Sequence, residues 1–129
     1  MTNSIQKTIL LLVAVLTFSQ CKKEISGCTD PNATNYNYEA NQNCCCSYSG
    51  TVTFWNYNFN VGTISVNIGS ESHIISDDVE PFECSVSGCA NFYDLPYGTY
   101  TYSATSSTGE TWGPSTFTLS GNCLLFHLQ

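Results

Sequence analysis

Eight cysteines carry the most evident chemistry of this 129-residue chain. Cys21 lies shortly after an apolar run, and the other seven lie further along the chain: Cys28, Cys44, Cys45, Cys46, Cys84, Cys89 and Cys123. The spacing favours a bridge from Cys28 to a member of the triplet 44–46, closing a loop of about 15 residues that contributes roughly 3 kcal/mol in the chain-entropy model. It favours a second bridge between Cys84 and Cys89, with Cys123 taking another member of the triplet. One thiol then stays free.

The triplet could instead hold zinc together with Cys28 and a histidine. Structural zinc sites usually space their cysteines as Cys-x2-Cys, a pattern that three contiguous cysteines do not provide. Adjacent Cα atoms stand about 3.8 Å apart, whereas a relaxed disulfide prefers about 4.4–6.8 Å. Disulfides from the triplet to more distant cysteines are therefore the preferred interpretation.

Oxygen-rich stretches offer a calcium alternative, because Ca²⁺ prefers oxygen ligands. One candidate set is acidic: Asp77, Asp78, Glu80 and Glu83. A second set is Asp30, Asn32, Asn35 and Asn37. Neither has the spacing of an EF-hand loop, so we expect solvated loops and no cofactor, with calcium as the alternative.

Residues for catalysis are few. His73 and His127 both fall in predicted strands, and the sequence has neither a Gly-x-Ser-x-Gly nor a His-Glu-x-x-His motif. Asp94 and Glu110 could form a carboxylate pair for glycoside cleavage, but nothing in the sequence places them together. We therefore expect no enzyme activity.

Aromatic side chains are the remaining candidates for ligand contact. They are Trp55, Tyr57, Phe59, Tyr93, Tyr97 and Trp112. Exposed rings could stack on a glycan or dock a protein partner, which would make the chain a binding or interaction module. Buried rings would make it a purely structural spacer.

The first twenty residues have the layout of a signal peptide, with Lys7 before an apolar run at 9–16. That run is about half the 20 residues that a bilayer span needs, so we expect residues 1–20 to be removed. A cysteine after such a run resembles the lipobox of bacterial lipoproteins, which implies lipid attachment at Cys21. The following Lys22-Lys23-Glu24 has no aspartate at the second position, which by the same resemblance implies the outer membrane or cell surface. An ordinary secretory signal before a structural cysteine is the alternative.

All basic residues precede position 24, and all ten acidic residues lie from there onward. Nucleic acid and anionic lipid headgroups are bound through cations. These partners are therefore excluded for residues 24–129, and the expected membrane contact is the lipid anchor alone.

Residues 21–49 form a tether and a Cys-rich turn segment, since 27–37 is dense in side chains that bond their own backbone. This stretch is similar to a short Cys-Thr-Asp-Pro-x-Ala-x-Asn-Tyr-Asn motif that recurs in surface and secreted proteins of some Gram-negative bacteria.

The residue pattern of 50–129 predicts a small, all-β, antiparallel two-sheet sandwich of about seven strands. Runs of β-branched and aromatic residues between turn residues place them near 50–56, 63–69, 72–76, 90–95, 99–105, 115–120 and 123–128. Only one face of each strand is apolar, which implies two packed sheets.

The segment 88–104 contains Leu95-Pro96-Tyr97-Gly98-Thr99-Tyr100 and resembles a hairpin of carboxypeptidase regulatory-like and transthyretin-like domains. The resemblance implies a sandwich with an accessory or interaction role and no active site. We therefore expect a membrane-anchored extracytoplasmic lipoprotein that acts as a non-catalytic binding module, with a spacer role as the alternative.

Overall fold

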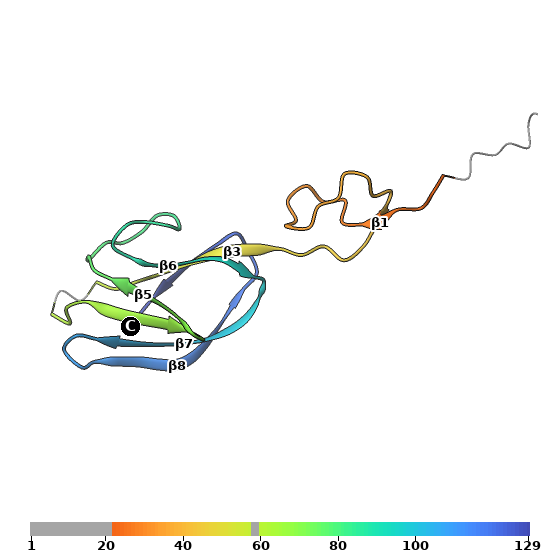
Figure 1. Cartoon of the computed structure of the whole chain (residues 1–129). Helices are drawn as coiled ribbons and strands as arrows, with labels where there is room; N and C mark the ends of the chain where they lie inside the picture. The colour runs from red at the N-terminus through yellow and green to blue at the C-terminus, as the bar shows by residue number, and fades with distance from the viewer. Residues whose placement is uncertain (1–21, 58–59) are drawn as a thin grey trace, which may run out of the picture.

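A computed structural model describes residues 22–57 and 60–129 of the chain (Figure 1). The predicted leader, Cys21 and Phe59 lie outside the described residues. The described part consists of strands, turns and loops with no helix, which confirms the predicted all-β class. It follows that this part contains no helix that could span a membrane.

Seven strands build the sandwich. They are β3 (Ser49–Trp55), β4 (Ile64–Ile68), β5 (Glu71–Ile75), β6 (Ala90–Pro96), β7 (Gly98–Ser106), β8 (Thr111–Leu119) and β9 (Cys123–His127). Each end lies within one residue of the predicted position, except that β8 begins four residues earlier. Two further strands of two residues each, β1 (Ser26–Gly27) and β2 (Gln42–Asn43), pair in the Cys-rich segment, where no strand was predicted.

The seven strands form two sheets with the orders β6-β3-β9 and β5-β4-β7-β8. Every sandwich pairing is antiparallel except that of β3 with β9, which run parallel with Thr51 opposite Cys123 and Trp55 opposite His127. The prediction of an antiparallel sandwich therefore holds for all pairs but this one. The parallel pair puts residues from the middle and the end of the chain side by side.

Apolar residues from both sheets meet in one core. Phe54 of β3 is fully buried at its centre. Its ring contacts Tyr102 at 5.1 Å and Phe117 at 5.7 Å between ring centroids, and both of these residues belong to the other sheet. It also contacts Phe92 and Phe126 of its own sheet. The core thus depends on rings that interlock between the sheets.

The early start of β8 results from a bulge at Gly113. Tyr102 pairs with Ser115 but Ala104 pairs with Trp112, so β8 holds one extra residue. Gly113 has φ of 78°, and a Cβ there would lie 2.7 Å from the Tyr102 carbonyl oxygen. Glycine meets both demands. The bulge lets the strand continue through a Gly-Pro pair that the sequence pattern marks as a turn, on an edge strand where proline is tolerated.

Two disulfides cross-link the described residues. Cys28 pairs with Cys46, which confirms the predicted bridge to the triplet and contradicts the zinc alternative, because these two sulfurs are bonded to each other. Cys84 pairs with Cys123 across 39 positions. The predicted bridge between Cys84 and Cys89 is therefore wrong, and so is the pairing of Cys123 with the triplet.

The reason for the Cys84–Cys123 bridge is the path of the β5–β6 connection, residues 76–89. This connection lies over the outer face of the three-stranded sheet, where the backbone N–H of Ser85 donates to the Thr53 hydroxyl at 3.0 Å. Parallel pairing brings Cys123 to the same face, opposite Thr51. Cys89, which directly precedes β6, is buried and unbridged.

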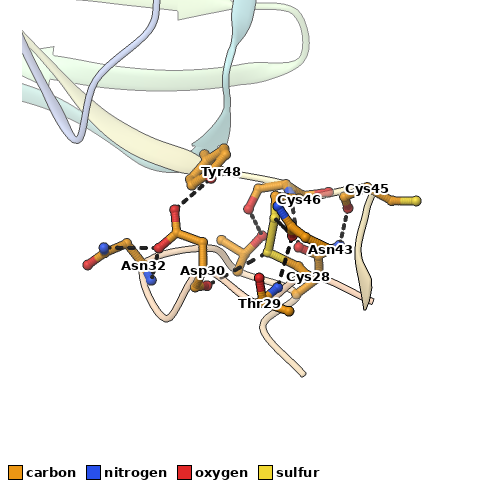
Figure 2. Close-up of a disulfide and its surroundings, with 11 residues drawn as sticks. Cys28, Thr29, Asp30, Asn32, Asn43, Cys45, Cys46 and Tyr48 are labelled. Atoms are coloured by element: carbon orange, nitrogen blue, oxygen red, sulfur yellow. Dashed lines mark hydrogen bonds between the residues drawn. A yellow bond between two sulfur atoms is a disulfide. The ribbon is translucent and has the colours of Figure 1, made fainter. Parts of the chain in front are cut away.

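Tyr48 joins the Cys-rich segment to the sandwich. Its ring stacks on Tyr97 at 5.5 Å, and its carbonyl accepts a 3.0 Å hydrogen bond from the Tyr97 N–H. Its hydroxyl donates to the Asp30 carboxylate at 2.7 Å (Figure 2). The segment is therefore attached at the end of the sandwich where β3 begins, as Figure 1 shows.

Candidate ligand-binding site

Three rings gather on the outer face of the three-stranded sheet where β3 and β9 end. Trp55 and His127 are register partners, and their rings stack at 4.0 Å with 10° between the planes. Tyr57 lies edge-on to both, at 4.9 Å from Trp55 and 5.9 Å from His127. We call these three residues the aromatic cluster.

The β5–β6 connection fixes the outer ring of this cluster. The Tyr57 hydroxyl donates a hydrogen bond to the Glu80 carboxylate. This hydrogen bond, and to a lesser extent burial and the nearby negative charge, raises the pKa of Tyr57 above its ordinary value. The hydrogen bond to Glu80 therefore holds the Tyr57 ring in place although 45% of the residue is exposed.

A hollow of about 380 Å³ adjoins the cluster. It is lined by Asn56, Tyr57, Glu110, Trp112, His127, Leu128 and Gln129. The lining combines three aromatic rings with two amides and one carboxylate, and no residue in it carries a permanent positive charge. A concave surface of this kind suits a small uncharged ligand that has both apolar and hydroxyl surface.

The hollow is built on strands and on the chain end that follows β9. Trp112 enters it from β8, where the Gly113 bulge sets Trp112 opposite Ala104 and against the core. On the other side, the Asn56 amide donates to the Leu128 carbonyl at 2.7 Å, and the Leu128 N–H donates to the Trp55 carbonyl at 2.9 Å. These bonds keep the last residues of the chain beside the rings.

The predicted aromatic contacts separate into two groups. Tyr57 and Trp112 line the hollow and Trp55 supports it. Tyr97 instead holds Tyr48 at the opposite end of β3, so its role in the structure is packing. Tyr93 lies apart on β6 and is 51% exposed.

Four polar residues of the hollow were not among the predicted ligand contacts: Asn56, Glu110, His127 and Gln129. The sequence predicts a strand that includes His127, and the structure confirms it. No local feature of the sequence indicates which strand lies beside it in the sheet. The parallel pairing of β9 with β3 decides this, and it joins segments about 70 positions apart. No short motif could have shown it.

The acidic calcium candidates do not converge on an ion site. Over the described ranges, no three His, Cys, Asp or Glu side chains are placed to hold a metal ion together. Glu80 is engaged by Tyr57. Asp77 and Asp78 line a separate hollow of about 240 Å³, which does not include Glu80 or Glu83.

The second calcium set is a hydrogen-bonded turn. The Asp30 carboxylate accepts the Asn32 N–H at 2.9 Å and the Tyr48 hydroxyl at 2.7 Å. Asn35 and Asn37 bind backbone groups within the same segment. Among the bonds to Asp30, the one from the Asn32 N–H lowers its pKa most, followed by that from Tyr48.

This lowered pKa predicts a dependence on acid. The stabilisation from ionised Asp30 is complete above its ordinary pKa of 3.8 and is lost as the pH falls through the lower folded-state value. We expect the difference in free energy of unfolding between the natural chain and Asp30→Asn to be constant from pH 5 to 7 and to shrink below about pH 4. Urea unfolding at each pH measures it, and a difference that stays unchanged down to pH 3 would contradict the expectation.

The possible carboxylate pair is not assembled. Asp94 lies on β6 near the start of β7, whereas Glu110 follows the end of β7. Since β7 has nine residues at about 3.3 Å each, the two carboxylates lie near opposite ends of the sandwich. His73 bonds to Glu71 at 2.8 Å on β5 and contacts the Phe92 ring.

Comparison with protein-family models, curated proteins and solved structures finds no match to this chain. The assignment of a function therefore rests on the geometry of the hollow and on the sequence.

Proposed function

We propose that the chain is a non-catalytic binding module, anchored outside the cell by lipid on Cys21, and that its aromatic hollow binds a neutral glycan. The observation that carries the proposal is the meeting of three rings, two amides and one carboxylate around one hollow. Sugar rings present C–H faces that pack on flat aromatic rings, and their hydroxyls bond to amides and carboxylates. The lack of lysine and arginine beyond position 23 disfavours acidic sugars.

The position of the hollow supports a role at the cell surface. The Cys-rich segment joins the sandwich where β3 begins (Figure 1). The hollow is lined by Asn56 and Tyr57, which follow the end of β3 at Trp55, so it lies at the opposite end of this strand. A lipid on Cys21 would hold the tether end near the membrane. The hollow would then face away from it and remain open to ligands.

The rigidity of the hollow supports binding as well. Three features fix the side chains of the hollow before a ligand binds. They are the stacking of Trp55 on His127, the hydrogen bond from Tyr57 to Glu80 and the bulge at Gly113, which positions Trp112. A site that is already ordered loses less entropy on binding. The resemblance of segment 88–104 to carboxypeptidase regulatory-like domains, which serve as accessory or interaction modules, supports the same role.

The anchor is tested by radiolabelled palmitate. We expect the exported natural chain to incorporate label and Cys21→Ala to incorporate none, because the sulfur of Cys21 begins the lipid modification. Two or more acyl chains hold a protein on a membrane effectively permanently, so Cys21→Ala should also leave the membrane fraction. Equal labelling of both chains would reject the anchor.

The hollow is tested by Tyr57→Ala with Tyr93→Ala as a matched control. Both tyrosines are exposed, at 45% and 51%, but only Tyr57 lines the hollow. On an array of neutral glycans we expect Tyr57→Ala to bind about tenfold more weakly, since packing an aromatic ring contributes roughly 1.5–3 kcal/mol and tenfold corresponds to about 1.4 kcal/mol. Tyr93→Ala should bind as the natural chain does. Equal losses in the two variants would place the ligand elsewhere, and no binding by the natural chain would favour the spacer role.

A further inference from the structure

The two disulfides leave three thiols in the described part of the chain: Cys44, Cys45 and Cys89. Cys89 cannot form a disulfide with Cys44 or Cys45 of the same chain. It precedes Ala90, which pairs with Phe54, whereas the Cys-rich segment joins β3 at Ser49. Five strand residues separate these two points, a span of about 17 Å, and Cys89 is buried.

Cys44 and Cys45 are also poor partners for each other. Their Cα atoms are adjacent in the chain and so stand about 3.8 Å apart, below the about 4.4–6.8 Å of a relaxed disulfide. Their neighbour Cys46 is already bonded to Cys28. Among residues 22–57 and 60–129, the fold therefore presents two adjacent thiols at its surface that have no good partner, and Cys21 is the proposed lipid attachment site.

Cys45 is the more accessible of the two. Its backbone has φ of 59°, and its carbonyl accepts a 2.6 Å bond from the Asn35 amide, whose oxygen accepts the Ser47 N–H at 2.8 Å. Figure 2 shows the Cys45 sulfur pointing away from the Cys28–Cys46 bridge, and the residue is exposed. Cys44 is only partly exposed, and its hydrogen bond with Cys45 raises the pKa of its thiol.

Charge favours contact between two copies at this segment. Residues 22–47 carry two lysines against three carboxylates, whereas residues 48–129 carry seven carboxylates and no lysine or arginine. Two sandwiches therefore repel each other, and two Cys-rich segments do so far less. On the proposed lipid anchor, equal tethers would also hold Cys45 of every copy at the same height above the membrane.

We propose that Cys45 forms a disulfide with Cys45 of a second copy of this chain, giving a two-fold symmetric dimer linked through the Cys-rich segment. The inference rests on the proposed function for export and anchoring, because an oxidising compartment supplies the disulfide that acts as oxidant.

The Cys45 thiolate attacks this external disulfide, forms a mixed disulfide and releases one thiolate. Cys45 of the second copy then attacks the Cys45 sulfur and displaces the other thiolate. Two thiols are oxidised to one disulfide, and the external disulfide is reduced to two thiols.

The test uses the full chain in membranes of the exporting cell, treated with glutathione disulfide, quenched with N-ethylmaleimide and separated without reductant. We expect a species of twice the monomer mass that dithiothreitol converts to monomer. Cys45→Ser should reduce it at least tenfold, and the matched variant Cys44→Ser should keep it. Peptide mapping should find a Cys45–Cys45 cross-link in the natural chain and in Cys44→Ser, and an intact Cys28–Cys46 bridge in all three proteins.

Four outcomes would overturn the inference: equal dimer in Cys44→Ser and Cys45→Ser, a cross-link mapped to Cys44 or Cys89, only glutathione adducts on monomers, or Cys45 joined to a different protein. Palmitate label in the same samples separates this result from the proposed function. Labelled chain without dimer rejects the dimer alone, whereas dimer without label rejects the anchor alone.

Discussion

Replacing Cys84 and Cys123 together by alanine should lower the free energy of unfolding by about 4 kcal/mol, the chain-entropy value for a loop of 39 positions. This bridge holds the β5–β6 connection on the outer face of the three-stranded sheet and fixes the start of β9 beside β3. For a domain of this size the loss corresponds to a decrease in Tm of roughly 15–30 °C. Urea and thermal unfolding without reductant measure both quantities.

Cys89→Ala is the control for this variant. If Cys84 were bridged to Cys89, as the spacing alone predicts, Cys89→Ala would remove the same cross-link. In the structure Cys89 is a buried free thiol, so its replacement should cost only about 1 kcal/mol, the scale of a small cavity. A Cys89→Ala variant as unstable as the double variant would contradict the Cys84–Cys123 bridge. The stability data thus test the connectivity independently of peptide mapping.

Phe54→Ala should lower the free energy of unfolding by about 3–5 kcal/mol, as large-to-small changes at buried aromatic residues do. Phe54 is fully buried, and its ring contacts Tyr102 and Phe117 of the opposite sheet. Its loss leaves a cavity between the sheets that neighbouring rings cannot fill without leaving their own positions. Because small domains are stable by only about 5–15 kcal/mol, this loss removes a large part of the total stability.

Phe82→Ala is the matched control, because Phe82 is 96% exposed in the β5–β6 connection. The same chemical change there should alter the free energy of unfolding by less than about 0.5 kcal/mol. Similar effects at positions 54 and 82 would show that the packed core is not formed around Phe54. Guanidinium unfolding followed by circular dichroism distinguishes the two results.

The binding proposal and the dimer proposal concern opposite ends of one molecule. The hollow lies where β3 ends, and Cys45 lies in the segment that precedes β3. A Cys45–Cys45 link would therefore leave both hollows of a dimer open. Two linked modules on one membrane would bind a repeating glycan with higher avidity than a single module, because the second contact is intramolecular.

Seven sandwich strands could be predicted from the local sequence pattern, apart from the early start of β8, together with the buried faces of several of them. Alternation of apolar and polar side chains is a local property, so sets such as Ile64, Val66 and Ile68 identify a strand and its inner face without knowledge of its neighbours. The bridge from Cys28 to the triplet was predictable for a similar reason, since the turn residues between them form a short loop that closes on itself. The spacing does not show which member of the triplet pairs with Cys28, because three neighbouring cysteines lie at nearly the same distance from it along the chain.

The Cys84–Cys123 bridge, the start of β8 and the hollow could not be predicted from the sequence, because they depend on contacts between different parts of the fold. The bridge and the hollow both depend on the parallel pairing of β9 with β3, and the energy of that contact comes from residues far apart in the chain. The start of β8 depends on a bulge at Gly113 that the neighbouring strand stabilises, although Gly-Pro alone favours a turn. Alternation shows which face of a strand is buried but not which strand lies beside it, because the same apolar face can pack on any partner. His127 and Trp55 therefore became neighbours only when the sheet order was fixed.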